Sequence, residues 1–337
     1  MTPAQVITSR VPETSAWRPT AELETLRARA ALLSEVRAFF AERGVLEVET
    51  PVLGQAGSTD VYLASLSTRA HTDKGRRRLW LQTSPEFHMK RLLAAGSGPI
   101  FQLARSFRNG EVGGRHNIEF CMLEWYRPGF TLNQLIDETT TLVRQLTGQA
   151  LPVRCYRYRE LFYHYLALDP FAERLSSLRE LAEHHAGMPP ATMAEEPREV
   201  CLDILMSARI EPHLGDQQLT AVVEYPASQA ALAKRHQDAH GDWVASRFEL
   251  YLNGVELANG YDELTDADEQ RQRFEADNAQ RLALGLEEVD IDERLLQAMA
   301  HGLPEGAGVA LGMDRLVQQV LGKPRLEDVI SFATPRC

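Results

Sequence analysis

The residues best suited to chemistry lie at positions 101–126, where two alternating, strand-like runs flank a connection rich in glycine and charged residues. Side chains alternate between the two faces of a strand, so every second residue shares a face. If the runs pair antiparallel, one face offers a guanidinium for a phosphate or carboxylate, an aromatic ring for a base and a carboxylate for an amine. This pattern predicts a nucleotide site. The face comprises Gln102, Ala104, Ser106 and Arg108 in the first run and Phe120, Met122, Glu124 and Tyr126 in the second.

An ordinary surface hairpin with loop charges is the alternative interpretation of this stretch. Gly110, Gly113 and Gly114 mark the connection as a mobile loop under either interpretation. We favour the site because Glu124 and Tyr126 are polar at positions that a simple amphipathic strand would fill with aliphatic side chains.

A second pair of acids lies in a predicted hairpin at 248–259, whose turn at 253–254 is Asn-Gly, the strongest short hairpin signal. A two-residue turn would place Glu249 opposite Ala258 and leave Glu249 and Glu256 on one face, roughly 7–8 Å apart at their backbones. Two carboxylates at this spacing suit a hard divalent cation such as Mg²⁺ carrying triphosphate oxygens. Two solvated acids on an exposed hairpin are the alternative, and we favour the metal site.

Small residues at 306–312 predict a strand that runs into a helix beginning near Met313. A ligand can approach the backbone closely there. Arg315 lies in the first helical turn, where acids are preferred, so an anionic ligand would explain it. The segment is neither a phosphate-binding Walker loop, since the Gly-Lys-Ser/Thr ending is missing, nor a dinucleotide fingerprint, since no βαβ unit surrounds it.

The elements that must position these residues follow from hydrophobic periodicity and from capping and turn signals. Turns and long irregular connections join the strands, which favours an antiparallel sheet flanked by helices, the α+β class. Residues 1–20 are expected to be a flexible tail, and residues 21–337 one domain with a mostly helical insertion at about 171–215. The predicted elements are a helix at 23–40 ended by Gly44; strands at 45–50, 79–83 and 99–107; a helix from Thr131 to Gly148; a capping box at Ser177; the hairpin at 248–259; helices at 266–284 and 291–301; and a strand, turn and helix at 308–321.

Composition predicts a globular, soluble, cytoplasmic protein. The chain has 337 residues, of which 44% are hydrophobic, and this is enough for a substantial core. No segment approaches the roughly 20 consecutive apolar residues of a membrane span, and the N-terminus has no apolar signal-peptide core. The four cysteines have neither metal-ligand spacing nor close pairing, so we expect reduced thiols.

The net charge of −11 disfavours a mainly electrostatic nucleic-acid binder. A local basic patch remains compatible with it. The densest basic cluster is Lys-Gly-Arg-Arg-Arg at 74–78, before a strand-like run, and we interpret it as a solvated hairpin loop.

Taken together, three segments resemble the motifs of class II aminoacyl-tRNA synthetases: GVLEVETP at 44–51, FRNGE to EFCMLEWY at 107–126, and GVALGMDRL at 308–316. Within that class the chain is similar to lysyl-tRNA synthetase. TSPEFHMKRL at 83–92, RHN at 115–117 and ELANGYDEL at 256–264 resemble its lysine and ATP segments. The resemblance covers about residues 22 to 335.

The resemblance is strongest to a stand-alone branch whose members ligate (R)-β-lysine onto a lysine of translation elongation factor P. LEWYRPG at 123–129, YPASQ at 225–229, and Ala310 where the synthetase has glycine all look like that branch. Only some twenty residues precede the first predicted helix, so no anticodon-binding domain is expected. The resemblance implies ATP and Mg²⁺ as cofactors, (R)-β-lysine or lysine as substrate, a homodimer, and neither stable tRNA binding nor membrane binding.

The resemblance also implies a role for each matching residue. Arg108 would bridge the substrate carboxylate and the α-phosphate, Phe120 would stack on adenine, and His116 and Arg315 would hold the triphosphate. Glu249 and Glu256 would hold Mg²⁺. Asn117 would belong to the ATP site, and Ala310 to the amino-acid pocket. Glu86 and Glu263, with Tyr126, would bind the substrate's amines, while Ser84, Glu124 and Asn259 would line that pocket. Ser84 and Asn259 could instead be turn residues, and Glu86 could cap a helix that starts after Pro85.

One departure from the family pattern lies at Gly110, where the second motif has a glutamate. The next acid is Glu111, which is either a retained second acid or a replacement for the first. If neither acid reads adenine, a hydrogen bond worth about 1–3 kcal/mol is lost. Two rival functions remain open: a truncated synthetase that charges tRNA with lysine, and a non-catalytic paralog that acts as a binding or regulatory module.

Overall fold

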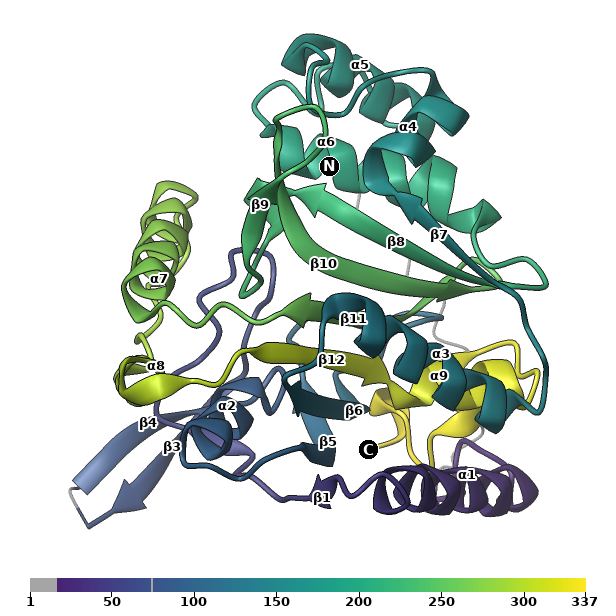
Figure 1. Ribbon diagram of the computed structural model, residues 1–337, viewed down its shortest axis with the longest axis vertical. Coiled ribbons are helices and arrows are strands. Elements are labelled where there is room, and N and C mark those ends of the chain that lie inside the picture. Colours follow the sequence, from purple (N-terminus) through teal and green to yellow (C-terminus); the bar gives the residue numbers. More distant parts are fainter. Residues whose placement is uncertain (1–16, 74) are drawn as a thin grey trace.

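A nine-stranded sheet forms the centre of the computed structural model, which describes residues 17–73 and 75–337 (Figure 1). Its strands are β1 (Leu46–Glu47), β5 (Ile100–Phe107), β6 (Glu119–Pro128), β7 (Val153–Arg157), β8 (Leu219–Pro226), β9 (Arg235–Gln237), β10 (Trp243–Leu252), β11 (Val255–Asp262) and β12 (Gly306–Gly312). The order is β1-β5-β6-β12-β11-β10-β8-β7, with β9 on β10. Among the described strands of this sheet, only the edge pairs β1/β5 and β7/β8 are parallel.

Helices lie on both sides of this sheet (Figure 1). They are α1 (Leu23–Ala41), α2 (Glu86–Ala94), α3 (Leu132–Thr147), α4 (Tyr158–Leu166), α5 (Leu175–Ala186), α6 (Arg198–Leu205), α7 (Ala267–Ala283), α8 (Glu293–Gly302) and α9 (Met313–Val320). The predicted α+β class is therefore confirmed. Of the tail predicted at 1–20, residues 1–16 lie outside the described residues.

The central strands use their two faces for different purposes, as period-two alternation requires. On β6, Leu123 and Trp125 are fully buried in the main core, together with residues of α1, α3 and α9. The alternate residues of the strand, among them Glu124 and Tyr126, line a cavity on the opposite face. The β5/β6 hairpin pairs antiparallel as predicted, with Gln102 opposite Glu124.

A helical unit of α4, α5 and α6 covers the end of the sheet formed by β8 and β10 and has its own apolar core. Helices α5 and α6 fall within the segment at about 171–215 that the sequence predicted to be mostly helical, and α4, which was not predicted, precedes it. The capping box predicted at Ser177 is wrong: α5 already begins at Leu175, after Arg174, which makes no side-chain cap. The capping box at Thr131 is confirmed, as is the left-handed Gly148 at the end of α3.

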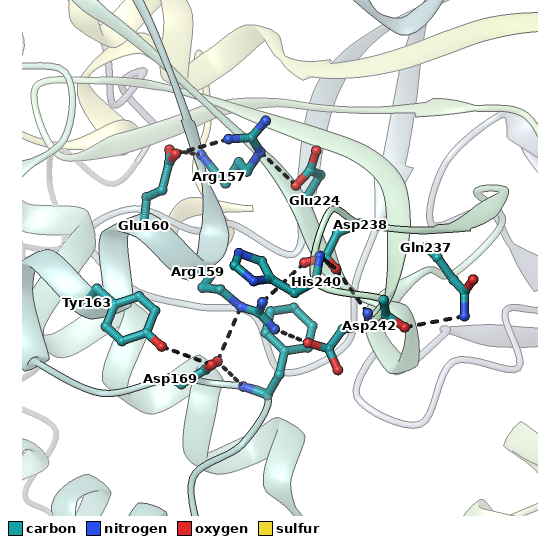
Figure 2. A network of polar contacts seen from close by, with 12 residues as sticks. Arg157, Arg159, Glu160, Tyr163, Asp169, Glu224, Gln237, Asp238, His240 and Asp242 are labelled. Carbon is teal, nitrogen blue, oxygen red and sulfur yellow. Dashed lines mark hydrogen bonds and ion pairs between the residues drawn. The ribbon is translucent and has the colours of Figure 1, made fainter.

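Arg159 on α4 ties this helical unit to the connection between β9 and β10 (Figure 2). Its guanidinium forms ion pairs with Asp169 at 3.3 Å and Asp238 at 3.4 Å, and a further one with Asp242. Burial opposes the charged form of Asp238, but two backbone N–H donors and Arg159 lower its pKa below the ordinary value. The ion pairs therefore hold α4 against the connection between β9 and β10, and β10 carries part of the cavity wall.

A separate sheet has the order β2 (Leu53–Gly54), β4 (Gly75–Leu81) and β3 (Ser67–Thr72), and its β3/β4 hairpin projects from the body of the molecule (Figure 1). The strand predicted at 45–50 is shorter than expected, because β1 contains only Leu46–Glu47 and Pro51 follows soon after. The cysteines in the described residues are free thiols, as predicted. Among the same residues, no helix is both long and apolar enough to cross a membrane.

Candidate active site

A cavity of about 850 Å³ lies on the face of the sheet opposite the main core. This volume is in the usual range for a small-molecule site, about 300–1,000 Å³. Gln102, Ala104 and Ser106, which the sequence placed on the site face of the first strand, do not line the cavity. Its wall does include every residue to which the resemblance assigns a role. These residues are Ser84, Glu86, Arg108, Glu111, His116, Asn117, Phe120, Glu124, Tyr126, Glu249, Glu256, Asn259, Glu263, Ala310 and Arg315.

The guanidinium of Arg108 lies over the ring of Phe120, with its Cζ atom 5.1 Å from the ring centroid. Glu111 forms an ion pair with the same guanidinium at 3.6 Å. Gly110 between them has φ +81°, a left-handed conformation that favours glycine over glutamate. The departure from the family motif therefore has a local reason, and Glu111 is the acid of this loop that reaches the cavity.

Arg315 joins the loop between β5 and β6 to the β10/β11 hairpin. Its Nη2 donates to Nε2 of His116 at 2.8 Å, and its Nη1 donates to the backbone and side-chain oxygens of Glu256 at 3.0 and 3.2 Å. Arginine has only donors, so Nε2 of His116 must be the acceptor and the ring proton belongs on Nδ1. Burial and the neighbouring Arg315 both lower the pKa of His116, which keeps the imidazole neutral at physiological pH.

The β10/β11 hairpin has its turn at Asn253 and Gly254, both at positive φ, as the sequence predicts. The predicted register is wrong beyond the turn. A bulge follows the first pairs, so Glu249 lies opposite Asn259 and not opposite Ala258. The bulge inserts one residue on β11, yet Glu249 and Glu256 both still line the cavity.

The carboxylates of Glu249 and Glu256 fit Mg²⁺ in the manner in which it binds nucleotides, through one or two acids and phosphate oxygens. Glu249 accepts hydrogen bonds from the hydroxyls of Tyr225, at 2.6 Å, and Tyr251 and from Arg247, which orient it. Burial and the neighbouring Glu249 raise the pKa of Glu256. Among the described residues, no group of three or more His, Cys, Asp or Glu could hold a metal unaided. An ion here would therefore depend on ligand oxygens.

The other end of the cavity is acidic. Glu86 on α2 and Glu263 after β11 each lie 2.6 Å from Nζ of Lys90, which is 1% exposed. The hydroxyl of Tyr126 donates to Oε1 of Glu124 at 2.6 Å. Oε2 of Glu124 is buried without a partner among the described residues, which is unfavourable unless a ligand supplies a donor. An amine of a substrate is such a donor.

Burial shapes the protonation of these acids. It raises the pKa of Glu124 to about 8, with repulsion from Glu86 adding to the effect. Burial also raises the pKa of Glu263 to about 7, although the Lys90 ammonium opposes that rise. For Lys90, burial alone would lower the pKa, but Glu263 and Glu86 raise it above the ordinary lysine value. Glu124 and Glu263 are therefore close to their titration at neutral pH, where an incoming cation stabilises the ionised forms.

Three of the predicted residues use their polar atoms within the protein. Ser84 Oγ accepts from the backbone N–H of Glu86 at 3.3 Å, the turn arrangement that the sequence left open. Oδ1 of Asn259 accepts from Arg247 at 3.1 Å. Asn117 donates to the carbonyl of Glu119 at 2.6 Å, and its Oδ1 accepts from a backbone N–H at the C-terminal end at 2.9 Å. Asn117 thus fixes the cavity wall with its amide already engaged.

Sequence reasoning missed Lys90, Arg247 and Asp203. Lys90 lies one helical turn after Glu86, and Arg247 lies two residues before Glu249, so both share a face with a predicted acid. Asp203 comes from α6 and lines the cavity without any signal in its local sequence. Burial, the dominant effect, raises the pKa of Asp203 to about 6.

Comparison with known proteins places this geometry in a family. Residues 14–336 match the family model described as tRNA synthetases class II (D, K and N). The chain is 48% identical over 328 residues to a protein of Erwinia tasmaniensis named Elongation factor P--(R)-beta-lysine ligase, covering 96% of this chain and 99% of that protein. A protein of the same name from Salmonella heidelberg is 48% identical over 329 residues, with the same coverage. The chain therefore belongs to the class II tRNA synthetase family and, within it, to the elongation factor P (R)-β-lysine ligases.

Proposed function

We propose that the protein activates (R)-β-lysine with ATP as an acyl-adenylate and transfers the β-lysyl group to a lysine side chain of translation elongation factor P. The observation that carries this proposal is a single cavity with four features: buried acids at one end, arginines and a neutral histidine at the other, an aromatic ring and a carboxylate pair. The acids suit the two amines of a diamino acid, and the arginines suit phosphates.

In the first step, a carboxylate oxygen of the amino acid attacks the α-phosphorus of ATP. The bond from this phosphorus to the bridging oxygen breaks, and pyrophosphate leaves. Arg108 is positioned to neutralise charge on the carboxylate and the α-phosphate, while Arg315 and His116 hold the departing phosphates. No side-chain nucleophile is needed, so positioning and electrostatic stabilisation supply most of the rate.

The second step transfers the acyl group. The neutral amine of the acceptor lysine attacks the carbonyl carbon of the adenylate, the bond to the AMP oxygen breaks, and an amide forms with loss of a proton. Arg108 remains close to the α-phosphate and stabilises the AMP leaving group. The products are AMP and the β-lysylated acceptor.

The remaining assignments belong to the same proposal. Glu249 and Glu256 would hold Mg²⁺, which would neutralise charge on the triphosphate. Phe120 would stack on adenine, and Glu111 would take the place of the family's missing glutamate. Tyr126, Glu86 and Glu263 would bind the amines, with Ser84, Glu124, Asn259 and Ala310 completing the pocket.

At the level of the molecule, we infer one catalytic domain over residues 21–337 and a homodimer in the cytoplasm, where translation factors work. The exposed apolar residues Leu23, Leu46 and Leu53 near α1, β1 and β2 support the dimer. Stable tRNA binding is not expected for a chain of net charge −11.

Amino-acid-dependent ATP–pyrophosphate exchange tests the first step. Exchange should require Mg²⁺ and be faster with (R)-β-lysine than with (S)-β-lysine or α-lysine. A protein that exchanges equally well with neutral amino acids of similar length would contradict the assignment of the acidic pocket, and one without any exchange would contradict the enzymatic proposal.

A further inference from the structure

The projecting β3/β4 hairpin carries the basic cluster that the proposed catalytic site does not use. Arg69, Arg76 and Arg77 are exposed, and their guanidinium groups make no hydrogen bond or ion pair with any described residue. Arg78 differs, because it pairs with Glu287 after α7 and lies over the ring of Trp80. The hairpin is therefore anchored at its base by Arg78 and presents unpaired arginines beyond it.

The charge of this hairpin contrasts with that of the rest of the chain. Residues 67–79 contain five basic residues and one acidic residue, a net charge of +4 in a chain of net charge −11. Across the strand pair Arg69 lies directly opposite Arg78, whose charge Glu287 balances, while Arg69, Arg76 and Arg77 keep no counter-charge among the described residues. The surface is thus complementary to an acidic partner.

The position of the hairpin relates it to the cavity. Trp80, Leu81 and Gln82, at the end of β4, are part of the cavity wall. Arg77 precedes them on the same strand, roughly 10–13 Å away at about 3.3 Å per residue. A stable protein interface covers about 800 Å² on each partner, a patch about 30 Å across. A protein that inserts a lysine into the cavity would therefore also cover this hairpin.

Exposed apolar side chains lie close to the base of the hairpin. Leu284 and Leu286 are 57% and 41% exposed and lie within three residues of Glu287, the partner of Arg78. Charged side chains beside exposed apolar ones are typical of a protein-binding surface.

We propose that the β3/β4 hairpin is the docking surface for an acidic face of the protein acceptor whose lysine is acylated. This inference rests on the proposed function and adds to it a means of capturing the second substrate. The arginines Arg69, Arg76 and Arg77 steer the acceptor by charge, so their effect falls as salt screens them. They act on the acceptor only, because they lie outside the cavity that holds ATP and the amino acid.

The test compares the double variant Arg76→Glu/Arg77→Glu with the matched control Arg154→Glu/Arg209→Glu. Arg154 on β7 and Arg209 after α6 are also exposed and without a described side-chain partner, so both variants change the net charge equally. Pyrophosphate exchange should be unchanged in both variants. The hairpin variant should raise the KM for the acceptor at least about tenfold at low salt, and the difference from the control should shrink near 0.5 M salt, on the order of a 4 Å Debye length.

The possible outcomes separate the docking proposal from the proposed function. If the hairpin variant has the same acceptor KM as the control variant, the docking proposal is overturned. It is also overturned if the hairpin variant loses binding to total tRNA and nothing else. If pyrophosphate exchange falls in the hairpin variant, the milder variant Arg76→Ala/Arg77→Ala is measured instead. The docking proposal then requires a raised acceptor KM with unchanged exchange, and an unchanged acceptor KM overturns it. Absence of exchange in the unaltered protein would contradict the proposed function itself, and the docking proposal with it.

Discussion

At the scale of single residues, Lys90 supplies the positive charge that offsets two carboxylates of the acidic pocket. It lies 2.6 Å from both Glu86 and Glu263 and is almost completely buried, yet it does not line the cavity. Its ammonium therefore lies behind the two carboxylates, orients them and opposes the rise in the pKa of Glu263 while a substrate amine approaches from the cavity. We regard it as a positioning residue.

Replacing Lys90 with methionine tests this role. Without the ammonium, Glu263 loses the attraction that opposes its raised pKa, so it should protonate at higher pH. We expect the KM for the amino acid to rise about tenfold, about 1.4 kcal/mol, and the acid limb of kcat/KM to move upward by about one pH unit. The KM for ATP should stay unchanged.

Lys234→Met is the matched control, since Lys234 pairs with Asp262 and Glu305 outside the cavity wall. It should leave the pH profile in place. An unmoved profile in Lys90→Met, with lower thermal stability only, would assign Lys90 to the fold alone.

The raised pKa values of Glu263, about 7, and Glu124, about 8, predict a pH dependence of substrate binding. Below these values the empty pocket is partly protonated, and above them it is ionised. An ammonium group binds the ionised form, so the affinity for the diamino acid should increase as pH rises from about 6 to about 8.5. Calorimetry in buffers of different ionisation enthalpy should detect release of protons on binding at pH 7. Glu124→Gln should reduce that release, and an unchanged value would contradict the assignment.

The amino-acid sequence was sufficient to identify many residues of the cavity wall, but not Arg247 or Asp203, and not how the acids are held. Period-two alternation correctly assigned Glu124 and Tyr126 to the face opposite the core. It could not reveal Lys90, because a lysine near the middle of an amphipathic helix is usually solvated, and only tertiary packing buries this one.

At the scale of elements, close approach between β12 and β6 defines the amino-acid end of the cavity. Gly308 lies opposite Tyr126, and a Cβ atom on Gly308 would meet the Tyr126 ring and come within 2.5 Å of Oε1 of Glu263. The strand therefore needs glycine so that the tyrosine and the acid can occupy adjacent space.

Gly308→Ala should displace Tyr126 and Glu263 and raise the KM for the amino acid more than tenfold, while overpacking costs about 1–3 kcal/mol of stability. Gly306→Ala in the same strand is the comparison, because its Cβ would come within 2.5 Å of the backbone carbonyl of Arg127 and not of pocket side chains. Exchange kinetics and thermal unfolding of both variants check this prediction. Equal loss of amino-acid affinity in the two variants would show that general destabilisation is the cause.

Element boundaries were predictable wherever local signals were strong, as with the Thr131 capping box and the Asn253-Gly254 turn. The register beyond that turn was not, because a bulge depends on how β10 and β11 fit their outer neighbours β8 and β12. Helix α4, which precedes the predicted helical segment, was not predicted for a related reason. It is stabilised by ion pairs between Arg159 and the acids of a distant loop, contacts that no local pattern records.

At the scale of the whole molecule, exposed apolar side chains around α1, β1 and β2 predict an interface between two copies of the chain. Leu23 and Leu46 are 62% and 56% exposed, and Leu53 is 42% exposed. Light scattering at micromolar concentration should give twice the chain mass of 37.8 kDa. Leu46→Asp should shift the protein toward the monomer, since burying a charge in an apolar interface is costly. A monomeric unaltered protein would contradict the prediction.

The central claim is that one cavity performs both activation and transfer of a β-amino acid. The most direct measurement is transfer of radiolabelled (R)-β-lysine to purified elongation factor P in the presence of ATP and Mg²⁺, with total tRNA as a competing acceptor. We predict that the label appears on the protein at a lysine side chain and that Arg108→Ala abolishes it. Label on tRNA but not on elongation factor P, from protein that is active in pyrophosphate exchange, would contradict the account.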